Sequence, residues 1–392
     1  MTTAEENGFG LRPTVHRIAN EYADVWIGSD ADEDVDYAYG GTRMVPPETP
    51  DAEVEQMLVR LLTYESWLKN RLINQSIRAG VLDDLGFRLP PDFLGSTVGG
   101  GRCLIRPRDS RVYGTLADPT SERFHGWIGS VFRDIGGYLN ARAGRIKLTP
   151  DFGGFAGLAD ILRQFTPHVL GIQADQGGCG GKTSYSTTGV VGAFELLGPD
   201  VRTPVTVIGA AGAMGSGFVE HLVSRDYTDL AVSDLVYHQD GAGPAVSPPA
   251  VARHLPAQRQ RFTPECLGRG GFIVATTWGE ELEHSDLDAI KPGSVLLLAH
   301  NLALPVGDAG LHLAARLADA GVTVLPGQIL TLGGALTARL EWFWRAGRTT
   351  RFDKPLGHVV VDRVVRYWTD RCVNRPPDGA PTPYHAMLAA AG

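Results

Sequence analysis

The chain has 392 residues, of which 43% are hydrophobic and 20% are charged, and its formal net charge is −8. This length suffices for two domains of ordinary size, and the composition is typical of a globular enzyme. The negative charge argues against a general affinity for nucleic acid or for anionic membranes, so we expect no partner of either kind.

The cysteines and the N-terminus indicate the cellular compartment in which we expect the protein. Four cysteines are widely spaced and form no C-x-x-C pair, which favours free thiols over a disulfide framework or a zinc site. The polar, acidic start is not a signal peptide, and no apolar run reaches the roughly 18 residues of a membrane helix. We therefore expect a cytoplasmic protein without a metal site.

The first half of the chain predicts strands at 24–28, 39–44, 103–105 and 168–172. A long helix is expected to begin near Thr49, which can cap it, with a proline and two acids in the first turn. Its apolar stripe continues to about residue 72. The stretch 74–98 has turn signals but no clear periodicity, and a second helix is predicted at 122–139.

A strand, a glycine-rich turn, a helix and a second strand follow one another between 205 and 233, and Asp234 ends the unit. Glycines let the backbone approach a pyrophosphate, the helix N-terminus offers free N–H groups, and the acid can accept hydrogen bonds from ribose hydroxyls. The spacing is G-x-x-G-x-x-G rather than the usual G-x-G-x-x-G, so a turn that binds nothing is the alternative. With its flanking strands, the unit favours a nicotinamide cofactor. An acid at position 234 repels a 2′-phosphate, which favours NAD over NADP. The expected cofactor-binding residues of the turn are Gly209, Gly212, Ala213, Met214 and Gly215.

The remaining elements complete an α/β chain of two domains. A connecting helix at 187–197 leads into the cofactor domain, whose later strands are predicted at 272–275, 294–299 and 322–325. We expect a substrate-binding and oligomerisation domain over 1–185, a Rossmann NAD-binding domain over 186–330, and C-terminal helices over 331–392 that return to the first domain.

Six motifs in this order resemble the glutamate/leucine/phenylalanine/valine dehydrogenase superfamily, and leucine dehydrogenase in particular. The resemblance runs from about residue 38 to residue 336. The motifs are Gly40-Gly41-Thr42-Arg43-Met44, Lys69-Asn70, Thr149-Pro150-Asp151-Phe152-Gly153, Thr187-Thr188-Gly189-Val190, Asn301 and Gly333-Gly334.

The resemblance implies an NAD-dependent homo-oligomer that acts on an amino acid, an oxo acid or an imine. It implies that Lys69 holds the substrate carboxylate and that Asp151 is the catalytic aspartate. Other implied site residues are Gly40 and Gly41 in the substrate pocket, Tyr39 at a specificity position, Asn301 near the nicotinamide, Thr331 in place of a family asparagine, and Thr188 and Thr276 beside the cofactor.

The residues also suit this chemistry by themselves. Oxidative deamination needs a cation to fix the α-carboxylate, for which Lys69 and Arg43 are candidates, and a group such as Asp151 that moves protons. A solvated helix residue is the alternative for Lys69, and a helix cap or turn residue is the alternative for Asp151. For Arg43 we favour a structural ion pair over contact with the substrate.

Arg102 stands where the family has its catalytic lysine. Guanidinium remains protonated and cannot act as a general base, and three interpretations remain open. Lys147, Lys182 or Asp151 moves the protons; or the substrate is an imine and Arg102 binds a carboxylate with two hydrogen bonds; or catalysis has been lost. The stretch 74–98 is also longer than the family's corresponding link and is a candidate pocket lining or oligomer contact.

Two other functions are considered. The glycine-rich segment 175–183 superficially resembles a phosphate-binding P-loop, but the G-x-x-x-x-G-K-[ST] pattern requires glycine where Gln176 stands. We favour a loop that lines the site, with Lys182 as a candidate cation. The alternative to an enzyme is a dinucleotide-binding homologue with a regulatory or scaffold role.

Overall fold

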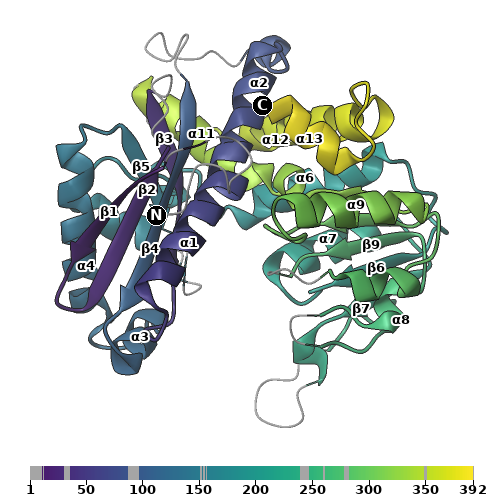
Figure 1. Cartoon of the computed structure of the whole chain (residues 1–392), viewed down its shortest axis with the longest axis horizontal. Coiled ribbons are helices and arrows are strands. Elements are labelled where there is room, and N and C mark those ends of the chain that lie inside the picture. Colours follow the sequence, from purple (N-terminus) through teal and green to yellow (C-terminus); the bar gives the residue numbers. More distant parts are fainter. Residues whose placement is uncertain are drawn as a thin grey trace. The chain divides into compact units, whose positions relative to one another are not determined.

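The computed structural model describes most of the chain, in two compact units (Figure 1). Asp151, the first ten residues and the segment 87–96 of the predicted insertion lie outside the described part. The described residues are 11, 13–30, 36–86, 97–150, 152, 155, 157–238, 247–258, 261–277, 282–347 and 351–391.

The first unit comprises 1–78, 86–182 and 335–357, and the second comprises 79–85, 183–334 and 358–392. The C-terminal segment 331–392 is therefore divided, whereas the sequence places it with the first domain. Its final part belongs to the second unit because α12 (Lys354–Thr369) packs there. Arg366 of α12 pairs with Glu195, 2.5 Å away, and Arg363 pairs with Asp84, 2.6 Å away.

A five-stranded sheet organises the first unit, in the order β1-β2-β4-β3-β5. β1 and β2 are antiparallel, β2 and β4 are antiparallel, and β3 runs parallel to both β4 and β5. The strands are β1 (Thr14–Ala19), β2 (Ala23–Ser29), β3 (Tyr37–Met44), β4 (Val98–Pro107) and β5 (Ile146–Pro150).

The two faces of this sheet differ, because successive side chains of a strand point to opposite sides. Val25, Ile27 and Cys103 belong to an apolar core that includes residues of α4 (Phe124–Ala141). The opposite face is covered in part by α1 (Asp51–Leu61), which contacts β2 and β4. Figure 1 shows α4 and α1 on opposite sides of the sheet. The candidate site residues lie on the face of α1.

The long predicted helix is interrupted by a π-helical turn. α1 leads into π-helical residues Leu62–Trp67, and α2 (Leu68–Arg78) continues from them. Glycines let this helix lie close to the sheet: a Cβ on Gly100 would lie 2.7 Å from the backbone nitrogen of Trp67. Short π-helical insertions occur often at functional sites. The remaining helices of this unit are α3 (Ser110–Ala117), α5 (Leu158–Arg163) and most of α11 (Leu332–Ala346).

Two local predictions in the first unit are wrong. Thr49 does not cap α1: Pro50 holds the N-cap position without a side-chain hydrogen bond, and the Thr49 carbonyl accepts a hydrogen bond from Arg106. The segment 168–172 is not a strand, since it pairs with β5 only through the bridge between Leu148 and Val169. The segment is an apolar run, but among the described residues it lacks a neighbouring strand that pairs with it along its length.

The second unit contains a six-stranded parallel sheet in the order β11-β10-β9-β6-β7-β8. The predicted strands at 205–208, 230–233 and 272–275 are confirmed. The strands are β6 (Val205–Ile208), β7 (Leu230–Ser233), β8 (Arg253–His254), β9 (Phe272–Ala275), β10 (Val295–Leu298) and β11 (Thr323–Leu325). This is a Rossmann-type sheet, in which β6 and β9 lie where the strand order reverses.

Helices pack beside the parallel strands in the order that the sequence predicts. Phe194 of α6 contacts Phe218 of α7 and Phe272 of β9, with ring centres 5.2 and 5.0 Å away. The helices of this unit are α6 (Thr183–Leu196), α7 (Ala213–Ser224), α8 (Pro264–Leu267), α9 (Asp308–Asp319), α10 (Gly327–Leu330), most of α12 and α13 (Pro383–Ala391).

The described residues also bear on the expected state of the cysteines and on membrane-spanning helices. The four cysteines are free, as expected, and the structure also shows that all four are buried. Among the helices that the structure describes, none has the length and apolar character needed to cross a membrane.

Candidate functional site

Several predicted site residues gather on one face of the first unit's sheet. Tyr39 pairs in register with Gly100 and Lys147, and Gly41 lies two residues further along the same strand. Arg102 lies two residues after Gly100, so its side chain leaves the sheet on the same side. The parallel pairing of β3 with β4 thus brings the predicted glycine pair and the substituted catalytic position together.

Arg102 is held by a carboxylate that the sequence interpretation did not include. Its Nη1 lies 3.3 Å from Oε1 of Glu65, and Nη2 of Arg43 lies 3.2 Å from Oε2. Arg102 is 3% exposed and Glu65 is 8% exposed. The predicted ion pair of Arg43 is therefore present, and the same partner serves Arg102.

The electrostatics of this group keep Glu65 ionised. Burial alone would raise the pKa of Glu65, but the charges of Arg102, Arg43 and Lys69 lower this pKa to about 2. Lys69 is four residues after Glu65, a separation that brings side chains together on a helix. Three cations thus surround one carboxylate, and the local charge favours binding of a further anion.

The glycine pair makes room for these contacts. A Cβ on Gly41 would lie 3.1 Å from Nη1 of Arg102 and 3.5 Å from its Cζ, so the guanidinium lies against the backbone of Gly41. A Cβ on Gly40 would overlap the carbonyl oxygen of Gly101. Side chains at either position would displace the arginine or the neighbouring strand.

Lys69 is a buried residue and not a solvated one, with 5% exposure. The adjacent Asn70 fixes this part of α2 to the sheet, because its Nδ2 donates to the carbonyl groups of Gly99, at 2.6 Å, and Tyr39, at 3.2 Å. A buried ammonium group that acts on Glu65 together with the charges of Arg102 and Arg43 suits the recognition of a carboxylate.

Tyr39, at the predicted specificity position, belongs to a buried aromatic and cationic cluster. Its hydroxyl donates to the carbonyl of Ala335, 2.7 Å away. Arg339 of α11 lies over its ring, and Trp342 contacts it edge-on. Burial raises the pKa of Tyr39, while the charge of Arg339 opposes this rise. Tyr39 is therefore a neutral residue fixed in place by α11.

Lys147, another proton carrier considered for this unit, is buried in the structure. Its Nζ donates to the Gly144 carbonyl, 3.2 Å away, and lies 4.7 Å from the ring centre of Trp342. Burial, with a smaller effect of the Arg345 charge, lowers its pKa to about 8. It can therefore exchange protons near neutral pH, unlike Arg102. Asp151, directly after β5, is outside the described residues.

The glycine-rich segment before α6 does not form a phosphate cradle. The buried carboxylate of Glu341 accepts hydrogen bonds from the backbone N–H groups of Cys179, at 2.9 Å, and Gly171, at 3.1 Å. A phosphate-binding loop directs such groups at its ligand, whereas here an internal carboxylate takes them. Lys182 lies beside Gly171, where a Cβ would come 2.9 Å from its Cε.

The glycine-rich turn for which the sequence predicts a dinucleotide lies between β6 and α7 of the second unit. Gly209 has φ +77°, and a Cβ on Gly215 would overlap the carbonyl oxygen of Gly209, so both positions require glycine. Gly212 is the N-cap of α7, and the first intrahelical bond is donated by Ser216 to Gly212, at 2.8 Å. The N–H groups of Ala213, Met214 and Gly215 precede this bond and have no acceptor within the helix. They form an anion-binding end that fits a pyrophosphate.

Asp234 and Thr276 support this turn from neighbouring strands. Oδ2 of Asp234 accepts the N–H of Ala211, at 2.9 Å, and Oδ1 accepts the N–H of Val236, at 3.1 Å. Carboxylate oxygens have further lone pairs, which leaves capacity for hydroxyl donors. The hydroxyl of Thr276 lies 2.9 Å from the Gly209 carbonyl, so Thr276 contacts the turn itself.

Three other predicted residues lie in the second unit. Thr331 and Asn301 are adjacent, with Thr331 Oγ1 3.0 Å from Oδ1 of Asn301 and 2.6 Å from the Gly327 carbonyl. Thr188, on α6, lies 2.8 Å from Nδ1 of His358. Asn301 and Thr331 thus form one polar pair after β10, while Thr188 is fixed to α12.

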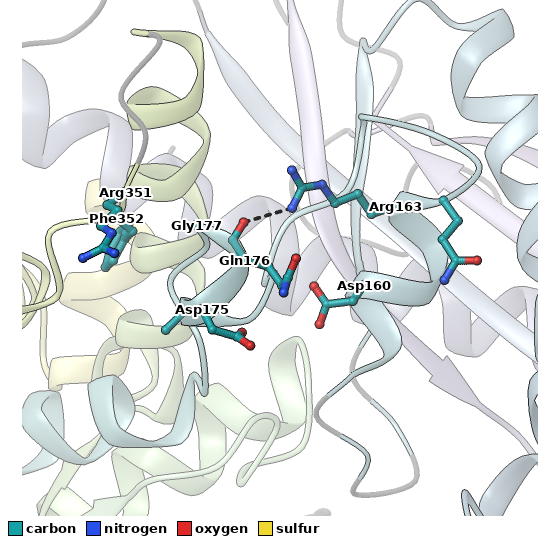
Figure 2. Close-up of a pocket in the computed structure, with 9 residues that line it drawn as sticks. Asp160, Arg163, Asp175, Gln176, Gly177, Arg351 and Phe352 are labelled. Atoms are coloured by element: carbon teal, nitrogen blue, oxygen red, sulfur yellow. Dashed lines mark hydrogen bonds between the residues drawn. The ribbon is translucent and has the colours of Figure 1, made fainter.

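A separate cavity of about 1020 Å³ lies in the first unit, and none of the predicted site residues lines it (Figure 2). Arg163 donates to the Gln176 carbonyl at its edge, 3.0 Å away. Asp160 carries a raised pKa because of its burial. Most of the lining side chains are exposed, which indicates a surface hollow. The lining residues are Asp160, Arg163, Gln164, Ala174, Asp175, Gln176, Gly177, Arg351 and Phe352.

Glu65 and Arg339 are the residues that the sequence interpretation missed. The spacing of Glu65 and Lys69, one helical turn apart, is a signal that could have indicated Glu65. Arg339 had no comparable signal, because its partners Asn70 and Asn74 are more than 260 positions away in the sequence.

No protein-family model matches the sequence, and no curated protein sequence matches it either. Solved structures do. A tryptophan dehydrogenase from Nostoc punctiforme has a TM-score of 0.60 at 15% identity, covering 97% of this chain and 94% of that chain. A hetero-hexameric glutamate dehydrogenase from Thermus thermophilus has a TM-score of 0.67 at 16% identity, covering 97% and 86%. The chain has the fold of these amino-acid dehydrogenases. A glutamate dehydrogenase from Peptoniphilus asaccharolyticus, with a TM-score of 0.62 at 14% identity, covers 100% of this chain and 91% of its own.

Proposed function

We propose that the chain is an NAD-dependent oxidoreductase that acts on the C–N bond of an amino acid or of a derived imine. The observation that carries this proposal is the group of buried Lys69 and Arg102 and partly exposed Arg43 around Glu65, on a fold shared with amino-acid dehydrogenases. We also propose membership of the superfamily that the motifs resemble, with the particular likeness to leucine dehydrogenase, and a cytoplasmic homo-oligomer.

The cofactor proposal rests on the second unit. The amino end of α7 would hold the pyrophosphate, Asp234 the adenosine ribose, and Thr188 and Thr276 would lie beside the dinucleotide. Bound NAD supplies the acceptor or donor of a hydride. The carboxylate of Asp234 disfavours the extra phosphate of NADP.

In the first unit, we assign Lys69 to the substrate carboxylate and Asp151 to proton transfer. In the oxidative direction, Asp151 takes a proton from the substrate amino group as the hydride leaves the α-carbon, and a C=N bond forms. Water then adds to this bond, and ammonia leaves with the proton that Asp151 returns. Asn301 and Thr331 are also proposed as substrate contacts.

Arg102 is proposed as a fixed cation that binds or orients the substrate. Its burial beside Glu65 supports this role, because a guanidinium cannot be the base. An imine substrate needs only hydride and proton delivery, and this reaction suits a site without the lysine. A role of Lys147 in proton exchange is supported by its lowered pKa.

Cofactor binding followed by turnover tests the proposal. Quenching of protein fluorescence by NADH measures binding, and NADH absorbance measures turnover with a panel of amino acids, oxo acids with ammonia, and preformed cyclic imines. Turnover of any member supports the enzyme. Binding of NADH without turnover of any member supports the regulatory or scaffold alternative, and failure to bind NADH contradicts both.

A further inference from the structure

We propose that Glu65 is a specificity-determining residue that excludes a second substrate carboxylate. Its own carboxylate occupies the position between Arg43 and Arg102 at which such a group would bind. The site would then accept substrates with a single carboxylate and an uncharged side chain. This inference rests on the proposed function only where it calls the bound acid a substrate. The preference for one carboxylate over two concerns binding alone.

The geometry of Glu65 is that of a bound carboxylate ligand. Each of its two oxygens contacts a different guanidinium, with N···O distances of 3.3 Å to Arg102 and 3.2 Å to Arg43. Two guanidinium groups that converge on one carboxylate form the kind of site that proteins use for acidic ligands. Here the acid is part of the chain.

The position of Glu65 is enforced by the fold. It lies in the π-helical turn Leu62–Trp67, and this turn lies against the sheet through Gly100. The guanidinium of Arg102 also lies against the backbone of Gly41. The carboxylate and its buried partner are therefore both fixed, and a ligand would have to displace Glu65 to reach the same nitrogens.

The charges explain why one ligand carboxylate is still accepted. Lys69, Arg43 and Arg102 carry three positive charges against the single negative charge of Glu65. Lys69, the third of these cations, is the residue to which we assign the α-carboxylate of a substrate. A second carboxylate would meet two guanidiniums that already share a partner, and would approach the negative charge of Glu65.

Binding of two acids of equal chain length tests the inference. Valerate has one carboxylate and glutarate has two, and calorimetry measures the affinity of each with and without NADH. Wild type should bind valerate more tightly than glutarate. Glu65→Gln, which keeps the shape and removes the charge, should bind glutarate about tenfold more tightly than wild type does, because a charge-assisted contact becomes available.

Two further variants separate the possible causes. Glu53→Gln removes an exposed acid of α1 and should leave the ratio of the two affinities unchanged. Glu65→Gln/Arg43→Gln keeps the net charge of the group constant and avoids two unopposed guanidiniums. It should still gain glutarate affinity if the vacated position, and not the overall charge, matters. Circular dichroism measures whether Glu65→Gln folds. If it does not fold, the double variant provides the test in its place.

The results that would contradict this inference differ from those that would contradict the proposed function. An unchanged ratio in both Glu65 variants would overturn the inference, as would wild type binding glutarate as tightly as valerate, or no glutarate binding to either variant. Absence of NADH binding would contradict the proposed function but would leave the comparison of the two acids intact.

Discussion

The guanidinium of Arg339 lies 5.1 Å from the ring centre of Tyr39, and both side chains are almost completely buried. Its Nη1 and Nη2 each donate, at 3.0 Å, to the side-chain oxygens of Asn74 and Asn70. Burial lowers the pKa of Arg339, yet no carboxylate contacts it among the described residues. α11 is thus joined to α2 by a cation and two amides, and to β3 by the contact of the same cation with an aromatic ring.

Replacement of Arg339 by Met should destabilise the protein by about 2 kcal/mol, because two buried amide oxygens lose their donors. This cost exceeds the relief gained by removing a buried charge. Urea unfolding measures the change, and Arg202→Met, at an exposed arginine, is the control. An equally stable Arg339→Met would mean that desolvation of the guanidinium offsets all of its contacts.

Exchange of Asp234 should change the preference between cofactors. Wild type should bind NADH more tightly than NADPH, and Asp234→Asn should bind NADPH about tenfold more tightly than wild type because charge repulsion is lost. Asparagine retains an acceptor for Ala211, whereas Asp234→Ala also removes the support of the turn. Fluorescence titration measures both cofactors. Equal wild-type affinities would contradict the assignment of Asp234.

Asp151→Asn should lower turnover by roughly a thousandfold, because an amide cannot take up the proton. NADH affinity should stay near the wild-type value, since the dinucleotide turn is in the other unit. Steady-state kinetics and NADH titration test the two halves of this prediction. Retained turnover would mean that another group transfers the proton, and Lys147 would be the first candidate.

Arg102→Lys should raise KM about tenfold, because an ammonium cannot reproduce the planar geometry with which the guanidinium meets Glu65 and orients the site. A lysine can lose its proton, so the pH profile of kcat should gain an ionisation that wild type lacks. Unchanged kcat and KM in Arg102→Ala would remove Arg102 from the site and direct attention to the stretch 74–98.

Lys147 should make the free energy of unfolding depend on pH in the alkaline range. Its pKa falls from 10.5 to about 8 in the folded protein, so the unfolded chain binds more protons between these values. Stability should therefore rise with pH from about 8 to 10.5, by up to about 3 kcal/mol. Lys147→Met should remove this rise, and Lys354→Met, at an exposed lysine, should keep it. Urea unfolding at pH 7.5 and 10 distinguishes them.

The second unit was largely predictable because its signals are local. Each of the strands at 205–208, 230–233 and 272–275 is a short apolar run that contains valine, and the first ends at a glycine turn. The unit's share of α12 was not predictable, since the pairs of Arg366 with Glu195 and Arg363 with Asp84 join distant segments.

The candidate site was predictable where motifs carry it and not where packing does. Tyr39, Gly41 and Arg102 are on one sheet face, as their neighbouring motifs suggest. The contact of Glu65 with Arg102 depends on a π-helical turn, and apolar periodicity does not distinguish such a turn from an α-helix. Nothing in the sequence near Tyr39 indicates that Arg339 lies over it.

The π-helical turn at Leu62–Trp67 also sets the rotation of everything that follows it in the helix. Each residue of an α-helix turns the chain by about 100°. Conversion of the turn to regular α-helix with every residue retained would rotate α2 by about that angle relative to α1, because a π-helical turn holds one more residue than an α-helical turn. Lys69 and Asn70 would then turn away from the sheet while the apolar stripe of α1 stayed in place. The wide turn thus lets residues on its two sides, which would lie on different faces of a regular α-helix, face the same sheet.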